Sequence, residues 1–65
     1  NDDALQSLAE AVRIDPSTAS THLNYAVTLA QAGRMAEALA EAQAALQIEP
    51  NYENAKRLIE EIRKK

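Results

Sequence analysis

The chain has 65 residues, no cysteine and a formal net charge of −3, so one small domain must be stabilised by an apolar core without disulfides or cysteine-based metal sites. No stretch approaches the roughly 18 consecutive apolar residues of a membrane span and no signal peptide is evident, so we expect a soluble chain that does not enter membranes. Residues 1–50 are acidic, and residues 51–65 form a small basic tail without interleaved aromatic residues, which argues against nucleic-acid binding.

The first predicted helix spans about residues 3–14. Its apolar side chains recur at intervals of three and four, the spacing that gathers them on one helix face: Leu5, Leu8, Ala9 and Val12. Pro16 lacks a backbone N–H and disfavours helical geometry at Asp15, so the helix ends there.

The second predicted helix spans about residues 18–32. We expect the Ser17 hydroxyl to cap its first turn, and Gly33 to end it in the left-handed conformation that glycine adopts readily. Its apolar face is wide and contains Ala19, His22, Leu23, Ala26, Leu29 and Ala30.

The third predicted helix, about residues 36–48, must run antiparallel to the second because Gly33 and Arg34 leave room only for a tight turn. Its many alanines allow helix backbones to approach closely, and we expect its larger side chains to fill the remaining gaps: Leu39, Leu46 and Ile48. Glu49 and Pro50 then repeat the earlier helix stop.

The last predicted helix spans about residues 52–64 after Asn51, a candidate cap. One face is apolar, with Ala55, Leu58, Ile59 and Ile62, and the opposite face is charged. That face offers five ion pairs at i,i+4 spacing: Glu53 with Arg57, Lys56 with Glu60, Arg57 with Glu61, Glu60 with Lys64, and Glu61 with Lys65. This pattern predicts a helix that closes a stack.

Pro16 and Pro50 lie 34 residues apart, and the stretches before them match. The matching pairs are Ala4 and Ala38, Leu5 and Leu39, Ala11 and Ala45, Val12 and Leu46, Ile14 and Ile48, and Asp15 and Glu49. With this period the chain resembles the tetratricopeptide repeat family. The resemblance implies an all-α, antiparallel helix-turn-helix solenoid fragment of four helices. Residues 1–16 would be the second helix of a preceding repeat, 17–50 a complete repeat and 51–65 a capping helix.

The sequence departs from the family pattern in two places. His22 and Ala42 replace large aromatic residues, so the repeat should be loosely packed unless Met35 and Tyr52 fill the space. Lys56 stands at the family's Trp position in the last helix, and Glu60 stands at its small-residue position, so the array is expected to end there.

In this family the first helices of successive repeats line a groove that binds a peptide or helix of another protein. The resemblance assigns to that groove Ser20, Leu23, Asn24, Val27, Ala30 and Gln31, continued by Asn54 and Arg57. The Asn24 amide can donate and accept hydrogen bonds with a peptide backbone, although Asn there also serves ordinary helix packing. Leu58 stands where some members carry a base that binds a partner's C-terminal carboxylate, so we do not expect that clamp.

Catalysis has little support in this sequence. His22 is the only histidine and has no acidic residue three or four positions away on its helix, so a packing or surface role is expected. Glu37 and Glu41 lie one turn apart, and a solvated helix face is expected for them. We predict no enzyme, no cofactor and no metal.

Three hypotheses for function remain. The first is a binding module whose groove holds a peptide or helix of another protein. The second is self-association into a homodimer through the stripe formed by Leu5, Leu8 and Val12, which a preceding helix would cover in a longer array. The third is a targeting arm of a larger enzyme. Neither the partner nor the localisation follows from these residues.

Overall fold

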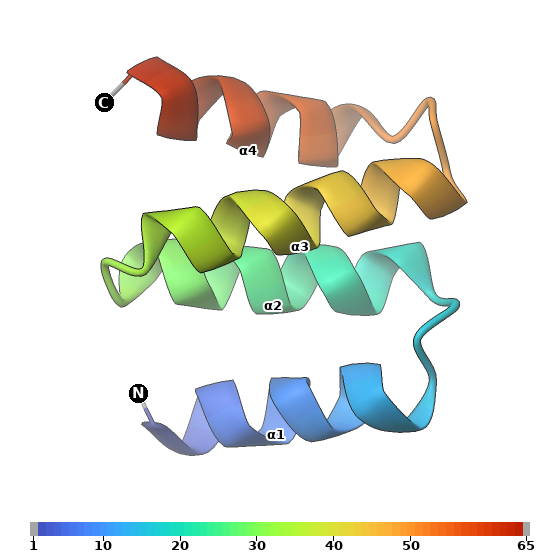
Figure 1. Ribbon diagram of the computed structural model, residues 1–65, viewed down its shortest axis with the longest axis vertical. Helices are drawn as coiled ribbons and strands as arrows, with labels where there is room; N and C mark the ends of the chain where they lie inside the picture. The colour runs from blue at the N-terminus through green and yellow to red at the C-terminus, as the bar shows by residue number, and fades with distance from the viewer. Residues whose placement is uncertain (1, 65) are drawn as a thin grey trace.

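The structure, a computed structural model, describes residues 2–64, with side chains from Asp3 onward. These residues form four helices: α1 (Asp2–Ile14), α2 (Ala19–Gln31), α3 (Met35–Ile48) and α4 (Glu53–Lys64). Successive helices run antiparallel, with the α2–α3 turn at one end of the molecule and the other two connections at the opposite end (Figure 1). The predicted all-α, helix-turn-helix fold is confirmed.

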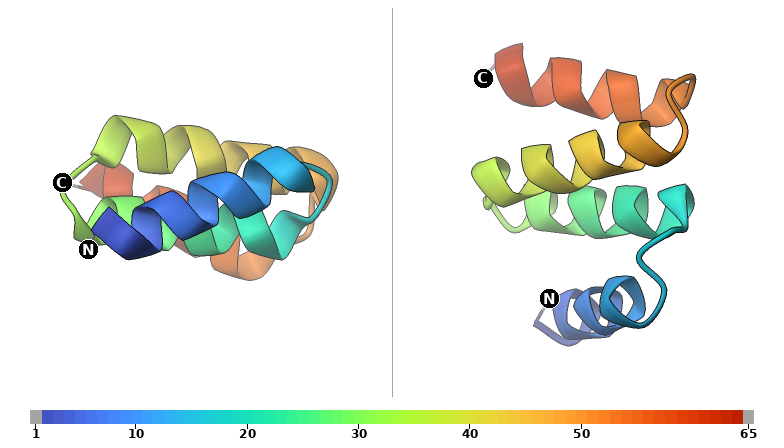
Figure 2. Two further views of the ribbon diagram at one scale, coloured as in Figure 1. Left: turned by 90° about the horizontal axis from the view of Figure 1, so that it is seen from below. Right: turned by 45° about the vertical axis from the view of Figure 1, so that its right-hand side comes forward.

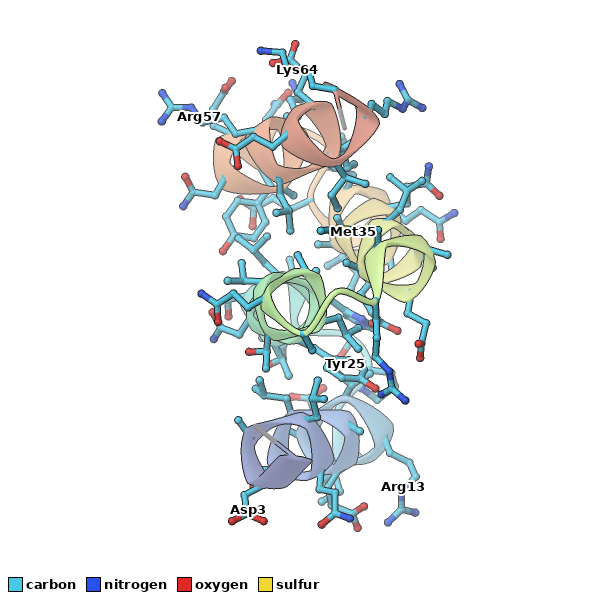
Figure 3. The ribbon with its side chains drawn as sticks, turned by 90° about the vertical axis from the view of Figure 1, so that its left-hand side faces the viewer. Asp3, Arg13, Tyr25, Met35, Arg57 and Lys64 are labelled. Carbon is cyan, nitrogen blue, oxygen red and sulfur yellow. The ribbon has the colours of Figure 1, made fainter. Side chains whose placement is uncertain are left out.

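The helices stack in three tiers. α2 and α3 lie side by side in the middle tier, with α1 on one side of the pair and α4 on the other (Figures 2 and 3). α2 therefore contacts all three other helices, whereas α1 contacts α2 and α4 contacts α3 and α2.

The end of α2 follows from Gly33. Its φ of +85° lies in the left-handed region, where a side chain would strain the backbone. The Gly33 N–H donates to the Ala30 carbonyl at 3.1 Å and the Arg34 N–H donates to the Leu29 carbonyl at 2.9 Å. Both bonds satisfy carbonyls that the helix end would leave unpaired, in the pattern of a Schellman motif. The predicted helix stop at Gly33 is confirmed.

The predicted cap at Ser17 is wrong. The residue before α2 is Thr18, and no side chain caps the helix. The Ser17 hydroxyl instead donates to Asp15 Oδ1 at 2.9 Å, and the Thr18 hydroxyl donates to Asp15 Oδ2 at 2.8 Å. Hydrogen bonds from Thr18 and then Ser17 stabilise the carboxylate and lower the pKa of Asp15 below its usual 3.8. Both hydroxyls therefore bind Asp15 within the connection between α1 and α2 and do not cap the first turn of α2.

The core lies between α2, α3 and α4 and is built mainly from alanine. One buried cluster joins Ala19, Leu23, Ala45 and Ala55, with Leu46, Tyr52 and Leu58 against it. A second joins Ala26, Ala42 and Ile59, with Leu39, Leu46 and Leu58 against it. Leu39 and Leu46 fill gaps as predicted, and Tyr52 compensates for the small residues around it. Ile48 does not, because 41% of it is exposed at the end of α3.

α1 is the least buried helix. Its apolar stripe, formed by Leu5, Leu8, Ala9 and Val12, is only half-buried, and Ile14 is 74% exposed. Tyr25, which is half-buried on α2, lies between the middle tier and α1 (Figure 3). The core clusters contain no residue from the described part of α1, so it contributes less apolar burial than α3 or α4.

The ion pairs differ from those predicted. Among the described side chains, the pairs join Glu10 to Arg13, His22 to Glu41, and Arg34 to Glu37. The pairs expected within residues 53–64 are not formed, because these exposed side chains gain little from pairing in water and keep their rotamer freedom. The expected partner of Glu61, Lys65, lies outside the described residues.

Candidate functional site

The side chains assigned to a groove lie on α2 and α4, and most are open to solvent. Those that are exposed comprise Ser20, Asn24, Val27, Gln31, Asn54 and Arg57. Leu23 is only 7% exposed and forms part of the first core cluster, so a partner cannot reach it. Ala30 is half-buried.

An apolar cleft lies between α2 and α4 where their C-terminal ends meet the beginning of α3. It has a volume of about 250 Å³, and its lining consists of Val27, Ala30, Gln31, Met35, Leu58, Glu61 and Ile62. The α2–α3 turn and the C-terminal end of α4 both lie at this end of the molecule (Figure 1). Most of the lining is apolar, and Glu61 is its only charged residue. We call this site the α2–α4 cleft.

The structure brings only some of the predicted groove residues to this cleft. Val27, Ala30 and Gln31 line it, whereas Ser20, Asn24 and Asn54 do not. Arg57 lines a separate, charged hollow with Leu46 and Arg63, and it projects outward from α4 (Figure 3). The cleft is therefore confined to one end of the predicted groove.

The residues predicted to line the groove did not include four that line the cleft, which are Met35, Leu58, Glu61 and Ile62. Leu58 and Ile62 were predicted to lie on the apolar face of the last helix, and both are half-buried. The 34-residue period could have placed two of these residues in the groove. It aligns Leu58 with Asn24 and Glu61 with Val27, and both Asn24 and Val27 were assigned to the groove. Met35 lies just before the predicted start of its helix and could not be placed by periodicity.

His22 is a buried polar side chain whose two ring nitrogens each have a hydrogen-bond partner. The side chain is buried, with Nδ1 at 2.8 Å from Glu41 Oε1 and Nε2 at 2.7 Å from the Pro16 carbonyl oxygen. A carbonyl and a carboxylate accept hydrogen bonds, so the protonated ring, with an N–H on each nitrogen, can donate to both. Burial lowers the pKa of His22, but the hydrogen bonds that the ring donates to Glu41 and Pro16 outweigh it and raise the pKa above 6.5.

This contact fixes the connection between α1 and α2 against α3. The expected packing role of His22 agrees with its position, but the solvated face expected for Glu41 is wrong, because Glu41 is half-buried against His22. Periodicity compares positions within one helix, so it could not show that α3 supplies this carboxylate. Across the described residues, no group of three or more His, Asp or Glu side chains could hold a metal ion.

Comparison with known proteins gives one result. A family model described as tetratricopeptide repeat matches residues 1–62, whereas no curated protein and no solved structure matches the chain significantly. Repeats of this family are non-catalytic and generally mediate protein–protein interactions. Within residues 2–64, every helix is too short or too polar to cross a bilayer. The matching family model spans nearly the whole chain, and the chain belongs to the tetratricopeptide repeat family.

Proposed function

We propose that this chain is a protein-binding module that holds a peptide or helix of another protein along the face shared by α2 and α4. The observation that supports it best is the α2–α4 cleft. Apolar hollows with a few polar groups at their rim are typical binding sites, because a ligand gains by burying apolar surface there. Gln31 supplies an amide at that rim that can donate and accept hydrogen bonds.

The proposed repeat organisation is consistent with this face. We propose that residues 17–50 form a complete repeat, that residues 1–16 are the second helix of a preceding repeat, and that residues 51–65 close the stack. α2 and α4 are then equivalent first helices, and the cleft lies between them. A stable interface buries about 800 Å² per partner, so a partner that contacts only the cleft should bind weakly.

Two matched substitutions test the binding face. Val27 is 37% exposed in the cleft, and Ile48 is 41% exposed at the end of α3, outside it. Short peptides are first selected for binding to the wild-type chain from a random library. Val27→Glu should then weaken the selected peptides at least tenfold, because it places a charge against the apolar wall. Ile48→Glu should leave binding unchanged, and equal behaviour of the two variants would reject the cleft as the binding site.

A second candidate function, self-association, is favoured by α1. Its stripe of Leu5, Leu8 and Val12 is half-buried although it is apolar, so a second copy that covered it would bury more apolar surface. Sedimentation equilibrium over a wide concentration range decides this point. A monomer at every concentration would reject self-association. The third hypothesis, a targeting arm of a larger enzyme, depends on sequence outside residues 1–65 and stays a prediction.

A further inference from the structure

The α2–α4 cleft combines an apolar interior with a single acidic group. Val27 and Ala30 come from α2, Met35 from α3, and Leu58 and Ile62 from α4, while Glu61 is exposed beside them. No described basic side chain lies within ion-pairing distance of Glu61. A ligand in the cleft therefore meets a carboxylate at its edge.

The basic residues of α4 are directed elsewhere. Arg57 and Arg63 line the other hollow, together with Lys56. Lys64 projects from the side of α4 that faces away from α2 (Figure 3). Within the cleft lining, the local charge is negative even though the end of the chain is basic.

From these observations we infer that the cleft selects segments in which one large apolar side chain lies next to a lysine or arginine. This inference rests on the proposed binding function and adds the chemistry of the partner. The apolar side chain would fill the cleft, and the neighbouring cation would lie against the Glu61 carboxylate. An acidic segment would instead face repulsion at the same rim.

Gln31 supports an extended segment in this position. Gln31 lines the cleft from α2 and Glu61 lines it from α4, and the Gln31 amide can donate and accept hydrogen bonds with a peptide backbone. The backbone of the segment would then bind to a residue of α2, while its cation binds to a residue of α4.

The test compares peptide selections on four versions of the full chain: wild type, Glu61→Gln, Glu61→Lys and Glu60→Lys. Glu60 is adjacent and exposed but does not line the cleft, so Glu60→Lys controls for the change in net charge. Wild type and Glu60→Lys should enrich an apolar residue beside Lys or Arg. Glu61→Gln should lose that basic preference, and Glu61→Lys should enrich Asp or Glu instead.

The affinities of the selected peptides for the same four proteins measure the contribution of Glu61 to binding. Glu61→Gln should weaken the wild-type-selected peptides by up to about fivefold, the range of an exposed ion pair, and added salt should reduce the difference. Equal effects of Glu61→Lys and Glu60→Lys, with binding still dependent on Val27, would overturn this inference alone. Failure to select any peptide sensitive to Val27→Glu would overturn the proposed function itself.

Discussion

α2 and α4 occupy equivalent positions of the 34-residue period, yet their side chains at matching positions meet opposite surroundings. In α2 these positions hold Ala19, His22, Ala26 and Leu29, which are buried. In α4 they hold Glu53, Lys56, Glu60 and Arg63, which are exposed. The backbone is helical in both segments, so the difference arises from the neighbours of each helix.

The neighbours explain the residue types. α2 contacts α1, α3 and α4, and needs apolar groups on most of its circumference. The described part of α4 contacts only α3 and α2, so one apolar stripe is enough and charged side chains cover the rest. Local sequence therefore encodes how many sides of a helix are covered.

The largest effect should come from Leu29, the largest fully buried side chain, whose counterpart in α4 is Arg63. Leu29→Ala leaves a cavity and should cost about 2–5 kcal/mol, enough to unfold much of a domain of this size. Arg63→Ala should change stability by less than about 0.5 kcal/mol. Urea unfolding followed by circular dichroism measures both, and comparable losses would contradict the difference between the helices.

The next largest effect should come from the charge on Glu41, because His22 is paired whereas its counterpart Lys56 is not. The folded state raises the pKa of His22 above 6.5, so the pair stabilises the fold fully below pH 6.5 and loses this contribution as the pH rises through the raised pKa. Glu41→Gln should cost about 1–2 kcal/mol below pH 6.5 and less at higher pH.

Nuclear magnetic resonance can follow this titration directly, because His22 is the only histidine. Glu41→Gln should lower the pKa of the ring, while Glu37→Gln, one turn away and exposed, should not. If the ring titrates identically in the wild type, Glu41→Gln and Glu37→Gln, Glu41 does not stabilise the protonated form of His22.

A smaller effect is expected at Gly33, which lets α2 stop within a tight turn. Gly33→Ala places a β-carbon on a residue with a φ of +85° and should cost about 1 kcal/mol. No atom within 4 Å would crowd that carbon, so the loss would report backbone strain alone. Thermal unfolding measures it, with Ala32→Gly as the control at the adjacent exposed position.

The smallest effect should come from α1, where Glu10 and Arg13 form an exposed ion pair. Glu10→Gln should change stability by at most about 0.5 kcal/mol, and by less in high salt. Comparison with Glu41→Gln under the same conditions separates a surface pair from a partly buried one. A loss at Glu10 equal to that at Glu41 would mean that burial does not strengthen the pair.

Much of the fold could be predicted because its signals are local. Pro16, Pro50 and Gly33 mark the ends of helices, and apolar spacing identifies the faces that meet. The contacts of Asp15 with Ser17 and Thr18 were missed because several short polar side chains compete for the same donors and acceptors. The His22–Glu41 pair and the place of Met35 in the cleft depend on how helices lie against each other, which periodicity within one helix does not encode.

The alanines of α3 have a mechanical consequence for binding. Ala38, Ala42 and Ala45 are fully buried; Ala42 and Ala45 belong to clusters that contain residues from both α2 and α4. Alanine has no side-chain rotamers. These buried alanines therefore set the distance between α2 and α4 without any loss of side-chain entropy. If the cleft binds a ligand as proposed, its walls are preorganised, and adaptation to that ligand is left to the flexible side chains of Met35, Gln31 and Glu61.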